Sequence, residues 1–133
     1  LFMPKQTAIF AARAAGIMPM GFIGTVAEFS DLDAFRETVR RSRRLGFFGA
    51  SVIHPSQVAI LNEEFRPSRE EVEHGRRVVA AYDKALAEGV GAVTVDGKMI
   101  DVPVVERARL LVEREEAIAA REARMRAMAA RLG

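Results

Sequence analysis

The sequence has no cysteine, and this absence excludes disulfide bonds, thiolate metal sites and cysteine nucleophiles. Such a chain is typical of a reducing intracellular compartment, so we expect a cytoplasmic protein. A long apolar run is also missing. Lys5 and Arg13 interrupt the apolar N-terminal stretch, and Gly16 and Pro19 would break a spanning helix. We therefore expect no membrane-spanning segment and no membrane partner.

The chain also lacks a strong excess of charge. Its 20 basic and 18 acidic side chains leave a formal charge of +2, and most of the arginines lie within a few positions of a glutamate. A nucleic-acid-binding protein normally concentrates uncompensated positive charge on one face, and it often interleaves aromatic residues for stacking. The sequence shows neither pattern, so we expect no nucleic-acid partner.

At 133 residues, half of them apolar, the chain is long enough for one ordinary domain. It begins at Leu1 rather than at a methionine, within a stretch that reads as helix. We therefore expect it to be a piece of a longer polypeptide.

The first half alternates helices with short apolar strands. Residues 5–15 are rich in helix formers and precede Gly16, and residues 18–23 then form an apolar run. Ser30 and Asp33 are spaced as a capping pair for a helix that ends at Gly46, and a second apolar run covers residues 50–53. This order, with strands that lack polar alternation, predicts parallel βα units.

The second half predicts a helix, a hairpin and a helix. Ser68 and Glu71 form a capping box for a helix through about Ala87. Asp96-Gly97, between expected strands at 92–95 and 98–100, is a type I′ hairpin signal. The last helix is expected over residues 103–131, with a narrow apolar seam that glutamates interrupt.

Five ordered motifs resemble the C-terminal part of the citrate lyase β-subunit-like family, the CoA-ester lyases that include malyl-CoA and citramalyl-CoA lyases. They are Ala11-Ala-Arg-Ala-Ala-Gly16, Arg43-Arg-Leu-Gly-Phe47, Ile53-His-Pro-Ser-Gln57, Asn62-Glu-Glu-Phe-Arg-Pro-Ser68 and Asp96-Gly-Lys-Met-Ile-Asp101. The resemblance implies an α/β fold, the C-terminal part of a (β/α)8 TIM barrel whose last two strands are residues 18–23 and 50–53. Residues 1–67 would be the last βα units, and residues 68–133 a helical extension with a β-hairpin that packs on a neighbouring subunit.

The resemblance also implies an activity. Such enzymes cleave a 3-hydroxyacyl-CoA, such as malyl-CoA or citramalyl-CoA, to a 2-keto acid and an acyl-CoA in a reversible Claisen-type reaction that depends on Mg²⁺. The metal ligands would lie upstream of Leu1, because no carboxylates here have metal-ligand spacing. The partner would be a CoA thioester, and the assembly a homo-oligomer, either a trimer or a hexamer. Family members often carry a lysine at Ala50 or Ser51 and an aspartate within residues 20–23, so these departures leave the acyl substrate open.

Asp101 is the candidate catalytic residue, as the base supplied to a neighbouring subunit's barrel. Its position two residues before Pro103 is equally that of a helix cap. The candidate residues for binding the CoA ester are Ile53, His54, Pro55, Gly21 and Met99. His54 would otherwise be a structural histidine at a strand end, and Gly21 part of a plain turn.

Two further readings stay open. A CoA thioesterase would use the same scaffold and the same thioester site. Alternatively, the chain is a non-catalytic oligomerisation segment whose amphipathic helices hold subunits together. The cluster Arg40, Arg41, Arg43 and Arg44 is expected to be solvated surface that complements a helix dipole, because the C-terminal ends of barrel helices lie opposite the active face.

Overall fold

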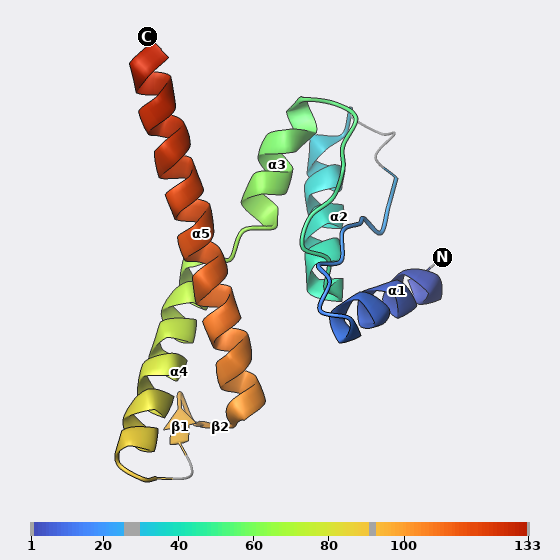
Figure 1. The fold of residues 1–133 in the computed structure, drawn as a ribbon. Coiled ribbons are helices and arrows are strands. Elements are labelled where there is room, and N and C mark those ends of the chain that lie inside the picture. The colour runs from blue at the N-terminus through green and yellow to red at the C-terminus, as the bar shows by residue number, and fades with distance from the viewer. Residues whose placement is uncertain (1, 26–29, 91–92, 133) are drawn as a thin grey trace. The chain divides into compact units, whose positions relative to one another are not determined.

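The computed structural model describes residues 2–25, 30–90 and 93–132. It divides into two compact units, Leu1–Arg66 (unit 1) and Pro67–Gly133 (unit 2). The chain is mostly helical, and its described residues contain one small sheet of two antiparallel strands (Figure 1).

The described residues of unit 1 form three helices, α1 (Phe2–Ala14), α2 (Leu32–Leu45) and α3 (Ser56–Glu64). The helix predicted over 30–45 is present, but its N-cap is Asp31, whose side chain accepts a hydrogen bond from the N–H of Ala34, so the predicted Ser30 cap is wrong. Gly46 ends α2 in the left-handed conformation at φ 118°, as predicted.

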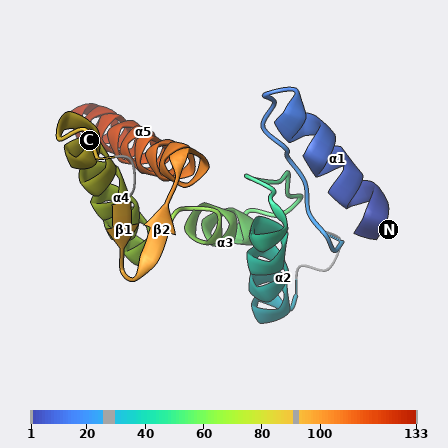
Figure 2. The same cartoon turned by 90° about the horizontal axis from the view of Figure 1, so that it is seen from below.

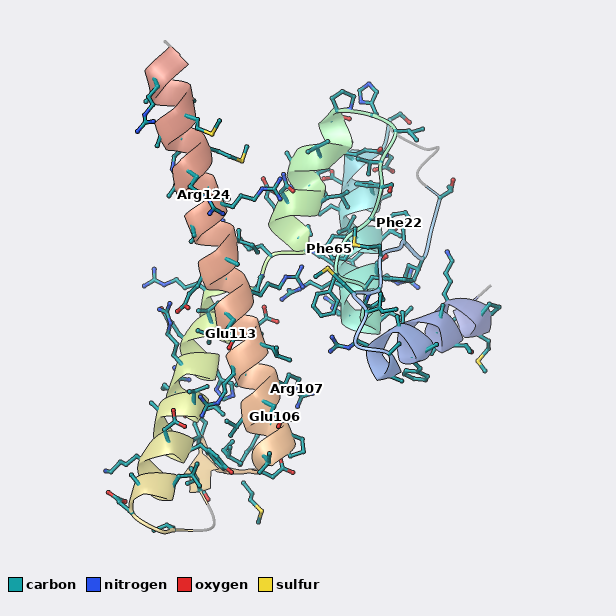
Figure 3. The ribbon with its side chains drawn as sticks, in the orientation of Figure 1. Phe22, Phe65, Glu106, Arg107, Glu113 and Arg124 are labelled. Carbon is teal, nitrogen blue, oxygen red and sulfur yellow. The ribbon has the colours of Figure 1, made fainter. Side chains whose placement is uncertain are left out.

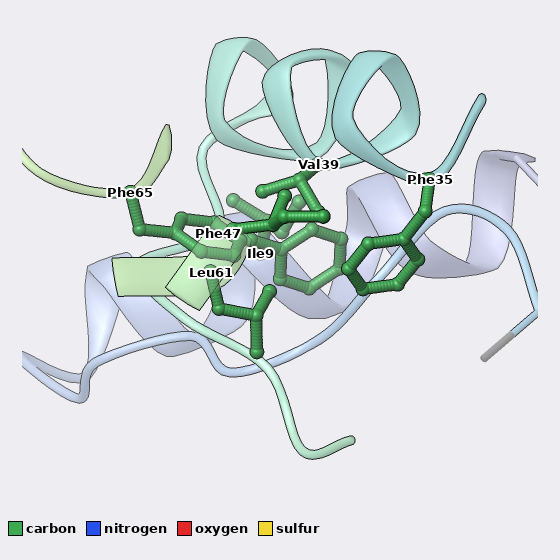
Figure 4. Close-up of a cluster of buried hydrophobic side chains, with 7 residues drawn as sticks. Ile9, Phe35, Val39, Phe47, Leu61 and Phe65 are labelled. Carbon is green, nitrogen blue, oxygen red and sulfur yellow. The ribbon is translucent and has the colours of Figure 1, made fainter. Parts of the chain in front are cut away.

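The core of unit 1 lies among its three helices and the segment that follows α2 (Figure 4). Its buried residues are Ile9, Phe35, Val39, Phe47, Ile60, Leu61 and Phe65. Phe22, from the loop after α1, stacks at a tilt on Phe35 with ring centroids 5.3 Å apart. Figure 3 labels Phe22 and also Phe65, which follows the end of α3. This ring contact therefore joins the loop after α1 to α2.

The strands predicted at 18–23 and 50–53 do not form. The two segments meet at a single parallel bridge, Met20 with Gly49, so the pairing lies before Ala50 rather than within 50–53. The N–H of Gly21 donates to the carbonyl of Gly49 at 2.8 Å, and the N–H of Phe48 donates to that of Pro19 at 3.0 Å. A strand pair with no described strand on either outer edge gains few ladder bonds, so the apolar runs stay irregular. The two segments run in parallel, as the sequence predicts, but they pair over one bridge instead of forming two strands.

Unit 2 consists of α4 (Arg69–Ala87), the hairpin β1 (Val93–Val95) and β2 (Lys98–Ile100), and α5 (Val102–Leu132). The predicted capping box is confirmed: Ser68 Oγ accepts from the N–H of Glu71, and Glu71 Oε2 accepts from that of Ser68. Figures 1 and 2 show α4 and α5 side by side, with the hairpin at one end of the pair.

The hairpin has the predicted turn. Asp96 and Gly97 both have positive φ, 50° and 76°, as a type I′ turn requires. Val93 pairs with Ile100, and Val95 with Lys98. Ala92, in the predicted first strand, lies outside the described residues. Val95 and Ile100 are buried with Val78, Val105 and Ala108, so the hairpin shares one core with α4 and α5.

The last helix buries only its first turns. Val105 and Ala108 are in the core of unit 2, whereas Met125 and Met128 are 60% and 64% exposed. Exposed charged side chains occur along its length, among them Glu106, Arg107, Glu113 and Arg124 (Figure 3). The predicted seam is therefore buried only where α5 packs on α4.

Candidate functional site

The six predicted site residues belong to both units. Four lie in unit 1, namely Gly21, Ile53, His54 and Pro55, and two lie in unit 2, namely Met99 and Asp101. Within unit 1, Gly21 pairs with the segment that leads to Ile53. Within unit 2, Met99 and Asp101 stand two residues apart at the end of the hairpin.

Asp101 is exposed and stands at the start of α5. Its Oδ1 accepts a hydrogen bond from the N–H of Val104 at 3.1 Å, and its carbonyl accepts one from the N–H of Val105. Asp101 therefore caps α5, which is the alternative to catalysis that the sequence predicted for it. A carboxylate has about four lone-pair sites, so the cap bond leaves the group capacity to accept a further proton. Capping and proton transfer are therefore compatible at this residue.

His54 is exposed, and its ring is oriented by the start of α3. Its Nδ1 lies 2.8 Å from Ser56 Oγ and accepts from the backbone N–H of Ser56 at 3.3 Å. The contact with the backbone N–H of Ser56 requires an unprotonated Nδ1 and therefore favours the tautomer with its proton on Nε2. The backbone carbonyl of His54 also accepts from the N–H of Gln57 in the first turn of the helix. The structural role that the sequence offered as the alternative for His54 is therefore present.

The other predicted binding residues differ in what they offer. Ile53 and Met99 are 67% and 76% exposed, so both present apolar surface. Pro55 is exposed at the N-terminus of α3. Gly21 donates its N–H to Gly49, and a Cβ at Gly21 would lie 2.4 Å from the ring of Phe47. The amide of Gly21 is therefore engaged within the fold, and the absence of its side chain serves the packing of Phe47.

An ionic cluster that sequence reasoning missed joins α4 to the hairpin turn. His74 Nδ1 and Arg77 Nη2 lie 3.1 Å and 3.0 Å from the same carboxylate oxygen, Asp96 Oδ2. The hydrogen bond from Arg77, and secondly that from His74, hold the pKa of Asp96 below its ordinary value. The side chain of His74 is 47% exposed while it makes this contact.

The arginine cluster of α2 is partly neutralised by α3. Arg36 and Arg40 both bind Glu64, and Arg40 Nε lies 2.8 Å from Glu64 Oε2. Burial raises the pKa of Glu64, but hydrogen bonds from Arg40 and Arg36 outweigh it and leave the pKa below its ordinary value. A hollow of about 180 Å³ beside this network is lined by Arg40, Arg43, Arg44 and Glu64. The network joins two helices of unit 1 and is not built from the predicted site residues.

Neither a metal centre nor a membrane segment is found in the described ranges. Over residues 2–25, 30–90 and 93–132, no three histidine, aspartate or glutamate side chains gather where one ion would contact them all. The described residues therefore offer no three-ligand site that fits a magnesium ion. In the same ranges, no helix combines the length and the apolar composition that crossing a bilayer requires.

Comparison with known proteins relates the chain to CoA-ester lyases. No family model matches. The chain is 42% identical over 116 residues to L-malyl-CoA/β-methylmalyl-CoA lyase of Cereibacter sphaeroides, a match that covers 86% of this chain and 36% of the relative. It is 38% identical over 122 residues to citrate lyase subunit β of Escherichia coli, covering 92% of this chain and 40% of that protein. The chain thus spans little more than a third of the length of these relatives.

Solved structures agree with the sequence matches. The protein CitE of Mycobacterium tuberculosis, in complex with magnesium, acetoacetate and coenzyme A, superposes with a TM-score of 0.65 at 29% identity, over 84% of this chain and 40% of that one. A citrate lyase of Burkholderia xenovorans superposes with a TM-score of 0.69 at 20% identity, over 86% of this chain and 35% of that one. At this identity the match supports the fold alone. The chain is therefore a homologue of the citrate lyase β-subunit-like family of CoA-ester lyases, over the C-terminal portion of its members.

Proposed function

We propose that this chain is the C-terminal part of an enzyme that cleaves a 3-hydroxyacyl-CoA to a 2-keto acid and an acyl-CoA. The observation that carries the proposal is the 42% identity to L-malyl-CoA/β-methylmalyl-CoA lyase over 116 residues. The identity to citrate lyase subunit β supports the same class of reaction. A structural neighbour with bound coenzyme A supports a CoA thioester as the substrate.

Residues 1–67 are proposed as the last βα units of a TIM barrel, and residues 68–133 as an extension that packs on a neighbouring subunit of a homo-oligomer. The parallel bridge between Met20 and Gly49 supports the first part, because neighbouring barrel strands run in parallel. Ile17, Met18 and Met20 are each at least 60% exposed, and further barrel strands would cover such apolar surface. The magnesium ion of this enzyme would be held by residues outside this chain.

Asp101 is proposed to transfer the proton at the thioester α-carbon. As the carbon–carbon bond breaks, the 3-hydroxyl would lose its proton to a base outside this chain and become the carbonyl of the keto acid. The electron pair of the broken bond passes to the thioester as an enolate, and a protonated Asp101 would donate a proton to the α-carbon. In condensation the carboxylate would remove that proton. The exposure of Asp101 and its spare lone pairs support this role. Ile53, His54, Pro55, Gly21 and Met99 are proposed to line the pocket for the CoA ester, with Gly21 contributing close packing rather than its amide.

The experiment for the activity uses the full-length polypeptide that contains this chain, with Mg²⁺ and L-malyl-CoA, β-methylmalyl-CoA or citramalyl-CoA. We expect the keto acid and the acyl-CoA to appear in equal amounts. Release of free CoA without a keto acid would identify a thioesterase. If no ester gives any product, the remaining interpretation is a non-catalytic oligomerisation segment. Turnover by the 133-residue chain alone would contradict the proposed location of the metal outside it.

The role of Asp101 is separable from its cap. Asn and Ser are as good N-caps as Asp but cannot transfer this proton, whereas Ala can do neither. We expect Asp101→Asn and Asp101→Ser to keep the melting temperature of the full-length enzyme and to lose at least 100-fold in kcat, the lower range of general acid–base contributions. If both variants keep wild-type turnover while Asp101→Ala is merely less stable, Asp101 is only a cap.

A further inference from the structure

The turn of the hairpin is held from one side by two donors of α4. His74 and Arg77 are three positions apart and therefore lie on one face of the helix. Both reach the same oxygen, Asp96 Oδ2, at 3.1 Å and 3.0 Å. A carboxylate only accepts hydrogen bonds, so the Nδ1 of His74 carries the proton in this contact. We call these three residues the turn clasp.

The clasp supplements a core that holds one face of the hairpin. Val95 and Ile100 are 9% and 5% exposed and belong to the core of unit 2. Successive strand residues point to opposite faces, so Met99 points away from this core and is 76% exposed. Asp101 follows Ile100 and is exposed as well. The buried residues anchor the strands, and the clasp anchors the turn that connects them.

The clasp is weak as a source of stability. The side chains of His74, Arg77 and Asp96 are 47%, 56% and 54% exposed, and exposed ion pairs contribute little to folding. The clasp has a well-defined geometry even though its energy is small, because two donors from one rigid helix converge on one atom. Such an arrangement restricts the direction of a short hairpin that has only three residues in each strand.

We propose that Asp96, held by His74 and Arg77, is a positioning residue that sets the direction in which the hairpin presents Met99 and Asp101. The inference rests on the proposed function, in which Asp101 transfers a proton. Displacement of a reacting group by about 1 Å can cost up to 100-fold in rate. A clasp that contributes little to folding is therefore still able to affect turnover.

The test compares clasp variants with a matched ion pair in the full-length enzyme. Arg77→Gln removes the charged guanidinium and leaves a shorter side chain, and Asp96→Asn removes the carboxylate charge but keeps a residue that tolerates positive φ. Arg69→Gln is the control, because it breaks the exposed pair of Arg69 with Glu73, 2.8 Å apart, on the same helix. All three variants remove one exposed ion pair of α4.

We expect Arg77→Gln and Asp96→Asn to lower kcat about tenfold, with KM changed less than twofold and the melting temperature shifted by less than about 2 °C. The double variant should be no slower than the slower single variant, because each substitution already removes the same ion pair between Arg77 and Asp96. Arg77→Lys should restore most of the rate. Arg69→Gln should behave as wild type.

Hydrogen exchange of the amides in residues 98–100 of the same proteins gives a readout independent of activity. We expect it to be at least threefold faster in both clasp variants and unchanged in Arg69→Gln. If Asp101→Asn abolishes turnover but the clasp variants keep wild-type kcat, the inference is wrong and the proposed function stands. If Asp101→Asn stays active, the proposed role of Asp101 is wrong, and the amide exchange rates of residues 98–100 then test the clasp by themselves. Unchanged exchange in the clasp variants would show that the clasp does not position the hairpin.

Discussion

The hydroxyl of Ser42 accepts a hydrogen bond from the backbone N–H of Ile23, with the two atoms 3.1 Å apart. The same hydroxyl donates to the carbonyl of Thr38 at 2.7 Å, and Ser42 is completely buried on α2. Ile23 follows the parallel bridge of Met20 with Gly49. One side chain thus ties the loop that carries Gly21 to the central helix of unit 1.

We expect Ser42→Ala to destabilise unit 1 by about 1–2 kcal/mol, because the Ile23 N–H loses its acceptor in a part-buried place. Thr7→Ala is a suitable control: Thr7 makes the same bond to a carbonyl four residues earlier, but at an exposed position. Urea unfolding measures the difference, and exchange of the Ile23 amide locates it. Equal stability of the two variants would contradict the importance of the Ser42 contact.

Gly21→Ala is expected to destabilise unit 1 by about 1–3 kcal/mol through overpacking. The new Cβ would lie 2.4 Å from Cε1 of Phe47, a core ring that is only 7% exposed. Phe47→Leu removes the opposing ring at a cost of its own, so the same glycine substitution should cost less in that background. A double-mutant cycle of unfolding free energies measures this coupling. Additive effects would mean that the glycine is needed for some other reason.

Local signals in the sequence predicted most of the local structure, with the exception of the Ser30 cap, whose place Asp31 takes. The capping box of Ser68 and Glu71 and the turn at Asp96-Gly97 both formed as expected. Each depends on atoms no more than three residues apart, so the sequence contains the whole interaction. The resemblance to CoA-ester lyases was likewise visible in ordered motifs, and the sequence comparisons confirm it.

Features that depend on distant partners were predicted less well. The apolar runs at 18–23 and 50–53 indicated burial in a sheet, but the described residues supply only one parallel bridge for them. The clasp of Asp96 with His74 and Arg77 spans about twenty residues, and no pattern in the sequence brings these side chains together. The sequence predicted Asp101 as a cap or a base; the structure shows the cap, and the base stays a proposal.

Acid is expected to weaken unit 1 through Glu64. The side chain of Glu64 is 14% exposed, and Arg36 and Arg40 hold its pKa below the ordinary 4.5 despite the opposing effect of burial. A carboxyl with a lowered folded-state pKa stabilises the fold above its unfolded pKa, and this contribution is lost as the pH falls from about 4.5 through the folded value.

The matched variant is Glu64→Gln, which keeps the shape but has no charge to lose. At pH 7 it should be less stable than wild type by about 1 kcal/mol, since the partners of Glu64 are partly exposed. That difference should shrink as the pH falls below 4.5. Unfolding curves recorded at several pH values between 7 and 3 measure it, and two parallel stability profiles would contradict a role for the Glu64 charge.

Gly75 sets how closely α4 and α5 approach. It is buried in α4, and a Cβ at this position would lie 3.3 Å from Cγ2 of Val112 and 3.5 Å from the carbonyl oxygen of Ala108. Gly75→Leu should therefore separate the helices and destabilise unit 2 by about 2 kcal/mol or more. Gly75→Ala should stay within about 1 kcal/mol of wild type, because its better helix propensity opposes the tight contact.

Ala87→Leu is the control, since Ala87 is an exposed residue in the last turn of the same helix. Loss of helicity in urea gives the free energy of unfolding for each variant. If Gly75→Leu and Ala87→Leu both unfold with the wild-type free energy, α5 shifts on α4 at no cost. The close packing that places the hairpin beside α4 would then not depend on the missing side chain.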